Sequence, residues 1–219
     1  MRVFKLAAVV AAVTTLWANA ALATEAGDWL IRAGVSYIVP KSDNGTIPGD
    51  GDEVPDIQVD VDDAAMLTFD GTYMITDNFG VELLAALPFE HDIYGKIDGV
   101  DGKVKLATVK HLPPTLSAVW RFNSDGQFQP YVGAGVNWTI FFDEQEKGPL
   151  DDPSVSLKLD DSWGLAGVVG VDVFLTDRMF INGNIRYMDI DSDVKVNGDK
   201  VVTAKVDPWV YAINIGWKI

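Results

Sequence analysis

The chain has 219 residues, no cysteine, and a formal net charge of −15 from 17 basic and 32 acidic residues. Proteins that bind nucleic acids present basic surfaces to phosphates, so this acidity argues against a nucleic-acid partner. Without cysteine, a disulfide-bonded scaffold and cysteine-based redox or zinc sites are excluded. The length is typical of one folded domain.

The first 23 residues have the order of a secretory signal peptide. A basic start is followed by an apolar run over residues 6–17 and by Ala21-Leu22-Ala23, which matches an A-x-A cleavage site. An earlier match, Ala18-Asn19-Ala20, leaves two cleavage points open. An uncleaved anchor is the alternative, but the apolar run is shorter than the roughly 20 residues that span a bilayer. We predict a signal peptide over residues 1–23 and a mature domain over residues 24–219.

Apolar and polar side chains alternate along the mature chain, which predicts β-strands with two different faces. In the last segment Ile213, Ile215 and Trp217 share one face, while Asn214 and Gly216 lie on the other. No mature segment has an apolar run long enough for a membrane helix. In chain order, the predicted strands cover residues 29–39, 64–76, 79–92, 104–122, 128–143, 156–175, 179–191 and 208–219.

The connections between these strands alternate in length. Three are short, at residues 76–78, 123–127 and 176–178, and four are longer and rich in Gly, Pro and Asp, at residues 41–63, 93–103, 144–155 and 192–201. Membrane barrels have short periplasmic turns and longer outer loops. Closure into a barrel also leaves no unpaired backbone edge in the bilayer. The sequence therefore predicts an all-β fold, an eight-stranded antiparallel transmembrane β-barrel.

The two faces of the predicted strands differ in composition. One is apolar and aromatic, and the other carries small and polar residues such as Gly135, Asn137 and Asp172. A water-soluble barrel would turn its apolar face inward, whereas a membrane barrel turns it to lipid between two aromatic girdles. The predicted girdles consist of Trp29, Trp209 and Trp217 at the periplasmic end and of Tyr37, Trp138 and Phe142 at the outer end. We predict that the aromatic face contacts lipid.

Six sequence blocks occur in a fixed order across nearly the whole mature chain. They are GVELLAALPFEH (80–91), HLPPTL (111–116), PYVGAGVN (130–137), LDDSWG (159–164), YMDID (187–191) and VDPWV (206–210). In order and spacing these blocks resemble the outer membrane protein W family. The resemblance implies a narrow, partly apolar barrel in the outer membrane of a Gram-negative bacterium. It also implies passive uptake of small hydrophobic molecules, with sideways release through the barrel wall.

The resemblance also implies contacts with other envelope components. Outer-membrane lipids and lipopolysaccharide are expected partners, and the barrel-assembly machinery is expected during biogenesis. The acidic loops, including Asp60, Asp62 and Asp63, are expected to meet lipopolysaccharide through bridging divalent ions. The run 189–193 begins like a calcium loop, but Val194 stands where that loop needs glycine, so we reject an EF-hand. No Gly-x-Ser-x-Gly motif, phosphate loop or triad spacing points to an enzyme, and no cofactor is expected.

Three prolines mark a possible exit for cargo. Pro88 lies in the third predicted strand, and Pro113 and Pro114 lie in the neighbouring fourth strand. Proline has no N–H and removes a ladder hydrogen bond wherever it stands in a strand. We hypothesise that the weakened seam between these strands opens laterally. The alternative is a local kink or bulge that only shapes the wall.

Both histidines of the chain, His91 and His111, lie near the same seam. A metal site would need further ligands within reach, such as Glu90 or Asp92. We interpret the two histidines as polar lining of the seam and predict no metal site.

A second group of residues is expected inside the barrel. Leu84 faces inward if its neighbours in the chain face lipid, and the matching family position helps to line a constriction. In the family an aromatic residue can oppose the position of Leu84, and in this sequence Arg186 stands in place of that aromatic residue. An inward Arg186 paired with Asp172 or Glu82 would seal the lumen against water and ions. The alternative is an ion pair that only strengthens the wall.

Three functions remain open at this stage. The first is passive uptake of small apolar compounds. The second is a structural or surface-interaction barrel with a plugged lumen. The third is a channel for ions or small polar solutes, which inward Glu82, Asp172 and Arg186 would favour.

Overall fold

The structure is a computed structural model that describes residues 23–41, 44–48, 55–97 and 101–219. The predicted signal peptide lies outside the described residues except for Ala23. The described segments form β-strands and one short 3-10 turn at Gly148–Leu150. None of them forms a helix that is long and apolar enough to cross a bilayer.

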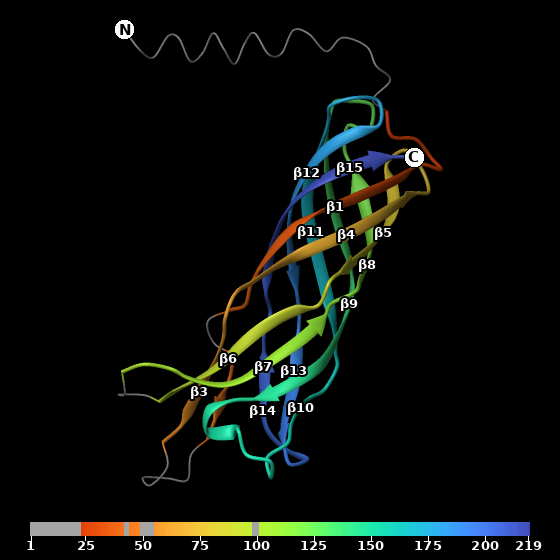
Figure 1. The fold of residues 1–219 in the computed structure, drawn as a ribbon. Coiled ribbons are helices and arrows are strands. Elements are labelled where there is room, and N and C mark those ends of the chain that lie inside the picture. The colour runs from red at the N-terminus through yellow and green to blue at the C-terminus, as the bar shows by residue number, and fades with distance from the viewer. Residues whose placement is uncertain (1–22, 42–43, 49–54, 98–100) are drawn as a thin grey trace, which may run out of the picture.

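Eight antiparallel strands of the described chain close into a barrel (Figure 1). They are β1 (Trp29–Val39), β4 (Ala64–Met74), β5 (Phe79–Ala86), β8 (Thr115–Arg121), β9 (Phe128–Glu146), β11 (Ser162–Phe174), β12 (Met179–Met188) and β15 (Trp209–Lys218). The last strand pairs with the first, and β9 pairs with β11, so the wall is continuous. The predicted fold class is confirmed.

The remaining strands extend the barrel at the end opposite the C-terminus (Figure 1). The strands β2 (Thr46–Ile47), β3 (Ile57–Val61), β6 (Phe89–Ile97) and β7 (Val104–Leu112) continue the main sheet from β9. The strands β10 (Leu157–Leu159), β13 (Asp191–Val196) and β14 (Asp199–Lys205) form a second sheet. We call these seven strands the outer extension, because long loops of membrane barrels face the cell exterior.

The outer extension corrects the predicted strand boundaries. The predicted strand 79–92 is divided into β5 and β6 at Leu87 and Pro88, and the predicted strand 104–122 is divided into β7 and β8 at Pro113 and Pro114. The region 192–201, predicted as a connection, forms most of the β13–β14 hairpin. Alternation alone missed the breaks because it continues through them, whereas the proline rings interrupt hydrogen bonding.

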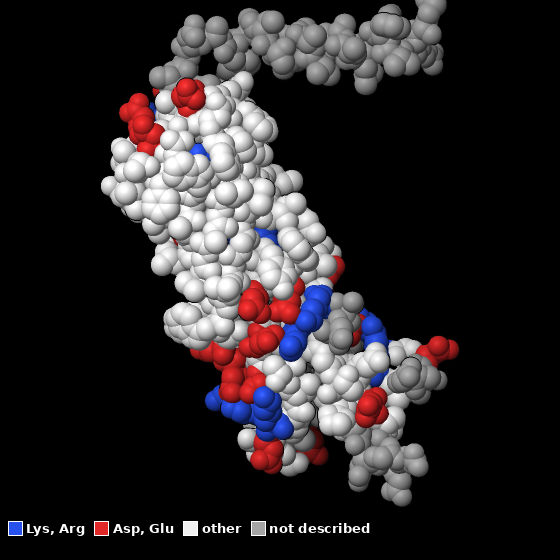
Figure 2. All heavy atoms as spheres, turned by 180° about the vertical axis from the view of Figure 1, so that it is seen from behind, with Lys and Arg blue, Asp and Glu red and all other residues white. Residues whose placement is uncertain are grey.

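The lipid-facing surface follows the alternation. On β15, Ile213 is 74% exposed, while its neighbour Asn214 is 2% exposed and points into the lumen. Figure 2 shows a wide band almost free of charged side chains over the barrel, while acidic and basic side chains gather over the outer extension. Trp209 pairs with Val39 and Tyr187, so it lies at the outer end of the barrel and not at the predicted periplasmic end. The last strand starts at the outer end, since the chain enters it from a long loop.

Inside, the molecule is layered along the barrel axis. The periplasmic end is closed by an apolar cluster of Leu30, Met74, Phe174 and Phe180. Polar and charged side chains fill the middle of the lumen. Towards the outer extension the interior becomes apolar again, with Ile38, Leu84, Phe89, Ala166, Met188, Ile190, Val206 and Val210 in one cluster. These layers position the candidate site.

Candidate functional site

A layer of charged side chains crosses the lumen in the membrane half. It contains equal numbers of cations and anions, namely Arg32, Arg121, Arg186, Asp70, Glu82 and Asp172, and each is at most 6% exposed. We call this group the charged layer. Every member faces the lumen because it occupies an inward position of a barrel strand. Charges at this depth are costly unless they are paired, so the partners decide what the layer can do.

Arg32 on β1 is the centre of the charged layer. Its guanidinium donates to Asp70 at 2.6 Å and to Asp172 at 2.8 Å, and a third carboxylate, Glu82, lies at 3.4 Å. Arg121 also contacts Asp172. Arginine suits this position because its planar guanidinium has five N–H donors and serves several carboxylates at once.

The charged layer is supported by neutral groups. Asn182 donates to Asp172 at 2.7 Å. The guanidinium carbons of Arg32 and Arg121 each lie 5.3 Å from the centre of the Tyr131 ring. A Cβ on Gly170 would lie 2.5 Å from that ring, so glycine at this position is needed to leave room for the tyrosine. The layer is thus a packed assembly of paired charges.

The structure places each predicted lumen residue in or beside the charged layer. Arg186 pairs with Glu82 at 2.7 Å. Asp172, the other partner considered for it, is held by Arg32 and Arg121. Leu84 is buried and lies opposite Asp70 in the ladder, where the charged layer meets the apolar cluster. The role of these residues in gating stays a prediction.

Sequence reasoning missed Arg32, Asp70 and Arg121. A usable signal was present, because each stands at an inward position of an alternating strand. Arg32 shares its face with Leu30 and Ile38, which are fully buried. To predict which of these charges pair, one must know the register of the closed barrel, and alternation does not give the register.

The wall between the third and fourth barrel strands has a gap beside this layer. Strand β5 pairs with β8 up to Leu84 opposite Thr115, and pairing resumes between β6 and β7 at Phe89 opposite His111. The intervening residues 85–88 and 112–114 have no ladder partner across the seam within the described chain. The three prolines predicted to weaken this seam, Pro88, Pro113 and Pro114, all lie in this interval. We call it the proline gap.

Backbone groups at the proline gap form hydrogen bonds with the strands on the far sides of the gap, β4 and β9. The Leu87 N–H donates to the Leu67 carbonyl at 3.1 Å, and the Pro114 carbonyl accepts from the Trp138 N–H at 3.0 Å. The Asn137 amide donates to the Pro113 carbonyl at 3.2 Å. Each strand is therefore anchored on its far side, and separation at the gap would leave these bonds intact.

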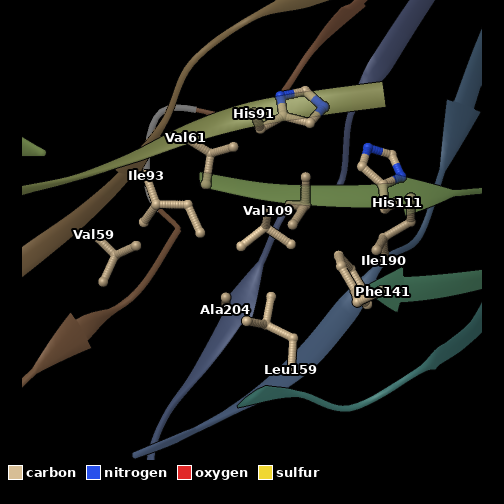
Figure 3. A pocket seen from close by; sticks show the side chains of 11 residues that line it. Val59, Val61, His91, Ile93, Val109, His111, Phe141, Leu159, Ile190 and Ala204 are labelled. Carbon is tan, nitrogen blue, oxygen red and sulfur yellow. The ribbon is translucent and has the colours of Figure 1, made fainter. Parts of the chain in front are cut away.

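A small apolar cavity lies in the outer extension next to the gap. Its volume is about 40 Å³, and eleven residues line it, among them Val59, Val109, Phe141, Leu159, His91 and His111 (Figure 3). Phe89 connects it to the barrel interior, because its ring stacks on His111 at 5.5 Å and it also belongs to the cluster around Leu84. A smaller cavity of about 10 Å³, roughly enough for one water, follows beside Leu84 and Pro113.

Both histidines lie in the outer extension, directly beyond the proline gap, and each is 4% exposed. Their rings stack with centroids 4.9 Å apart. Burial lowers the pKa of His91 and holds the pKa of His111 well below the usual value, because the charged form loses its hydration. The two imidazoles are therefore neutral at pH 7.

The outer surface opens into a wider apolar groove of about 440 Å³. Its apolar lining includes Ile47, Ile57, Ile97, Val104, Leu106, Leu150, Val196 and Val201. Val196 also packs on the cluster of Val109 and Leu159, two residues that line the histidine cavity. An apolar path of side chains thus runs from the outer groove past the histidines to the proline gap.

The predicted acidic loop residues are engaged in contacts on the surface. Lys96 pairs with Asp60 at 2.8 Å and lowers the pKa of that carboxyl, and Lys103 pairs with Asp62 at 2.6 Å. Asp63 accepts from the Tyr37 hydroxyl at 2.6 Å. Elsewhere in the described residues, carboxylate oxygens of Asp189, Asp191 and Asp207 lie within 4.8 Å of one another. Lys41 pairs with Asp207 at 2.7 Å. Lipopolysaccharide binding stays a prediction.

Comparisons with known proteins agree with this architecture. The protein-family model described as the OmpW family matches residues 25–219. The chain is 41% identical to outer membrane protein W of Escherichia coli K12, over 98% of this chain and 99% of the relative. It is 27% identical to the dibenzothiophene metabolism operon protein PahQ of Pseudomonas aeruginosa, over 88% of this chain and 89% of PahQ. The crystal structure of OprG from Pseudomonas aeruginosa matches with a TM-score of 0.78 and 38% identity, over 91% of this chain and 99% of OprG.

Proposed function

Because this chain belongs to the OmpW family of outer-membrane β-barrels, we propose that it takes up small hydrophobic molecules passively and releases them sideways into the membrane. Cargo enters the apolar groove, passes the histidine cavity and leaves through the proline gap. The observation that carries this proposal is the interrupted ladder between β5–β6 and β7–β8, which lies next to an apolar interior.

The charged layer supports sideways release over passage to the periplasm. A molecule that moved straight down the barrel would have to separate Arg32 from Asp70 and Asp172. Breaking a buried ion pair costs about 3–5 kcal/mol, and an apolar cargo gives nothing in return. At the proline gap no inter-strand ladder bond has to break, and the surrounding phase is lipid, which takes up apolar molecules.

One relative supports an apolar cargo. PahQ is named for an operon of dibenzothiophene metabolism, and dibenzothiophene is a flat, apolar ring system. Metabolism of such a compound from outside the cell requires that it cross the outer membrane. PahQ is 27% identical to the present chain, and the proposal takes from its name only the class of cargo, an apolar molecule.

A barrel with a plugged lumen is the second candidate function. The observation that favours it is the same charged layer, together with an inner cavity of only about 10 Å³. In that case the outer extension would serve as a binding surface for envelope or host components, including lipopolysaccharide. Neither function requires catalysis.

Restoring the missing N–H groups at the proline gap tests the proposal. The triple variant Pro88→Val, Pro113→Val, Pro114→Val offers three new ladder donors, and we expect it to lower uptake several-fold. Uptake is measured in Gram-negative cells with N-phenylnaphthylamine, a dye that fluoresces on reaching the membrane. The matched control is Pro130→Val, which changes a proline of β9 that lies in the closed wall opposite Val171.

The outcome separates the two candidates. Reduced uptake in the triple variant with normal uptake in the control supports sideways release. Unchanged uptake in a folded triple variant overturns it. If the wild-type chain itself gives no uptake above cells that lack it, the proposed uptake is overturned and the plugged barrel is favoured.

A further inference from the structure

Among the described residues, two nitrogen atoms in the apolar cavity of the outer extension have no hydrogen-bond partner in the protein. They are Nε2 of His91 and Nδ1 of His111, and both are buried. Buried polar groups are normally paired, because an unpaired one loses its hydration without replacement. Figure 3 shows the two imidazoles together at one side of the cavity, with Phe141 and aliphatic side chains around the rest of it.

The protonation of His91 follows from its other contact. Its Nδ1 lies 2.6 Å from the carbonyl oxygen of Asp62. A carbonyl oxygen only accepts hydrogen bonds, so Nδ1 carries the proton and donates. Since the ring is neutral at pH 7, Nε2 of His91 is left with a lone pair and accepts a hydrogen bond. Nε2 of His91 therefore favours a ligand that donates a hydrogen bond.

We propose that His91 and His111 form a binding site for the hydroxyl group of an amphiphilic cargo, such as a primary alcohol with an apolar tail. The hydroxyl donates its one hydrogen to Nε2 of His91 and accepts from Nδ1 of His111, which requires the tautomer of His111 that carries its proton on Nδ1. The cavity of about 40 Å³ takes the hydroxyl, and the tail has to displace aliphatic side chains between the cavity and Phe89. This inference rests on the proposed function, because it names the class of cargo.

The surroundings disfavour charged head groups. The carboxylates of Asp62, Asp63 and Asp92 are near enough to act electrostatically on His91, so a carboxylate or phosphate ligand would be repelled. An ammonium group would lose its hydration in a cavity lined by Val, Ile, Leu and Phe side chains. A hydroxyl is neutral and both donates and accepts, so it satisfies the unpartnered nitrogens at the lowest desolvation cost.

Binding of two matched compounds tests the inference. 1-Hexanol and n-heptane have the same number of heavy atoms and differ in whether the chain ends in a hydroxyl or a methyl group. The full-length protein in lipid nanodiscs, with ¹⁵N-labelled histidine, is titrated with each compound at equal concentrations in the lipid phase. We expect a shift of the His91 Nε2 resonance with 1-hexanol only. We also expect an affinity preference for 1-hexanol of about five-fold for each hydrogen bond formed.

A variant provides the second measurement. His91→Phe, His111→Phe keeps two stacked aromatic rings and removes the nitrogens, and we expect it to bind both compounds equally. Equal affinities of the wild-type chain for the two compounds, without a shift of Nε2, would overturn the inference and leave apolar uptake standing. Binding of neither compound would overturn both. If the variant does not fold, the nitrogen shifts of the wild-type chain decide alone.

Discussion

The membrane half and the outer extension distribute charge in opposite ways. The barrel has an apolar outside and paired charges in its lumen, whereas the outer extension has lysine–aspartate pairs outside and an apolar interior. Single strands cross this change. On β9 the inward residues Asn137 and Thr139 are followed by Phe141, which packs in the apolar clusters.

The surrounding phase explains the difference. In the bilayer, apolar side chains are already out of water when they face lipid, so the lumen is free to hold polar groups. Beyond the bilayer the same strands face water, and their apolar side chains have to turn inward. The chain therefore has two interiors that are stabilised in different ways, the lumen by paired charges and the outer extension by apolar packing. A cargo path fits the apolar one, and a seal fits the charged one.

The largest effect should come from removing the centre of the charged layer. Arg32→Ala leaves Asp70 without its 2.6 Å partner and leaves Asp172 with Arg121 as its one remaining cation and with the amide of Asn182. We expect a loss of about 3–5 kcal/mol in the free energy of unfolding, as for other broken buried pairs. Urea titration in lipid vesicles, followed by gel mobility of the folded barrel, measures it. A loss below about 1 kcal/mol would show that water enters the lumen and solvates these charges.

A smaller loss should follow from Arg186→Ala. Glu82 loses its 2.7 Å partner but keeps Arg32 at 3.4 Å. We expect a loss of about 1.5–3 kcal/mol, the range for a hydrogen bond to a charged group. If Arg186 also seals the lumen, single-channel recordings in planar bilayers will show conductance that the wild-type chain lacks. An unchanged recording would assign Arg186 to the wall and remove it from any gate.

These two arginines also show what the sequence could and could not predict. Alternation predicted the number of strands, their order and which face meets lipid, because a period of two leaves little freedom. It placed Glu82, Asp172 and Arg186 in the lumen for the same reason. The partners depend on which strands meet across the closed barrel. Arg32 and Asp172 are 140 residues apart, and no local pattern links them.

The breaks in the long strands were harder to predict. A proline in an alternating segment is compatible with a bulge, a kink or an end of pairing, and Pro88 and Pro113 alone do not distinguish these. The register identifies an interruption of pairing at these prolines, since β5 pairs with β8 while β6 pairs with β7. The sequence predicted β7, β10 and the start of β6 as strand but assigned them to the barrel, because alternation alone does not show that the apolar face turns inward in the outer extension.

In the outer extension, we expect low pH to reduce the stability of the fold through protonation of the histidines. Burial depresses the pKa of both His91 and His111 in the folded state, so below about pH 6.5 the unfolded chain binds more protons than the folded one. Stability is therefore complete above that pH and falls as the pH is lowered from 7 to 5. The slope approaches about 1.4 kcal/mol per pH unit for each histidine.

The His91→Phe, His111→Phe variant is the control for this slope, because it keeps the ring packing and removes the titration. We expect its stability to change less than that of the wild-type chain over the same interval. Parallel pH profiles for the two proteins would mean that both imidazoles accept protons without leaving the fold, which contradicts their burial in an apolar cavity.

The smallest effect is expected on the outer surface, and it sharpens the contrast with Arg32. Lys96 pairs with Asp60 at 2.8 Å, almost the same distance as the buried pairs, but its side chain is 47% exposed. Water and salt compete for such a pair, so Lys96→Ala should cost less than about 1 kcal/mol. Urea titrations at low and high salt measure both the loss and its screening. Two ion pairs of nearly equal length would then differ several-fold in energy, and a salt-insensitive loss as large as that of Arg32→Ala would contradict the division into two interiors.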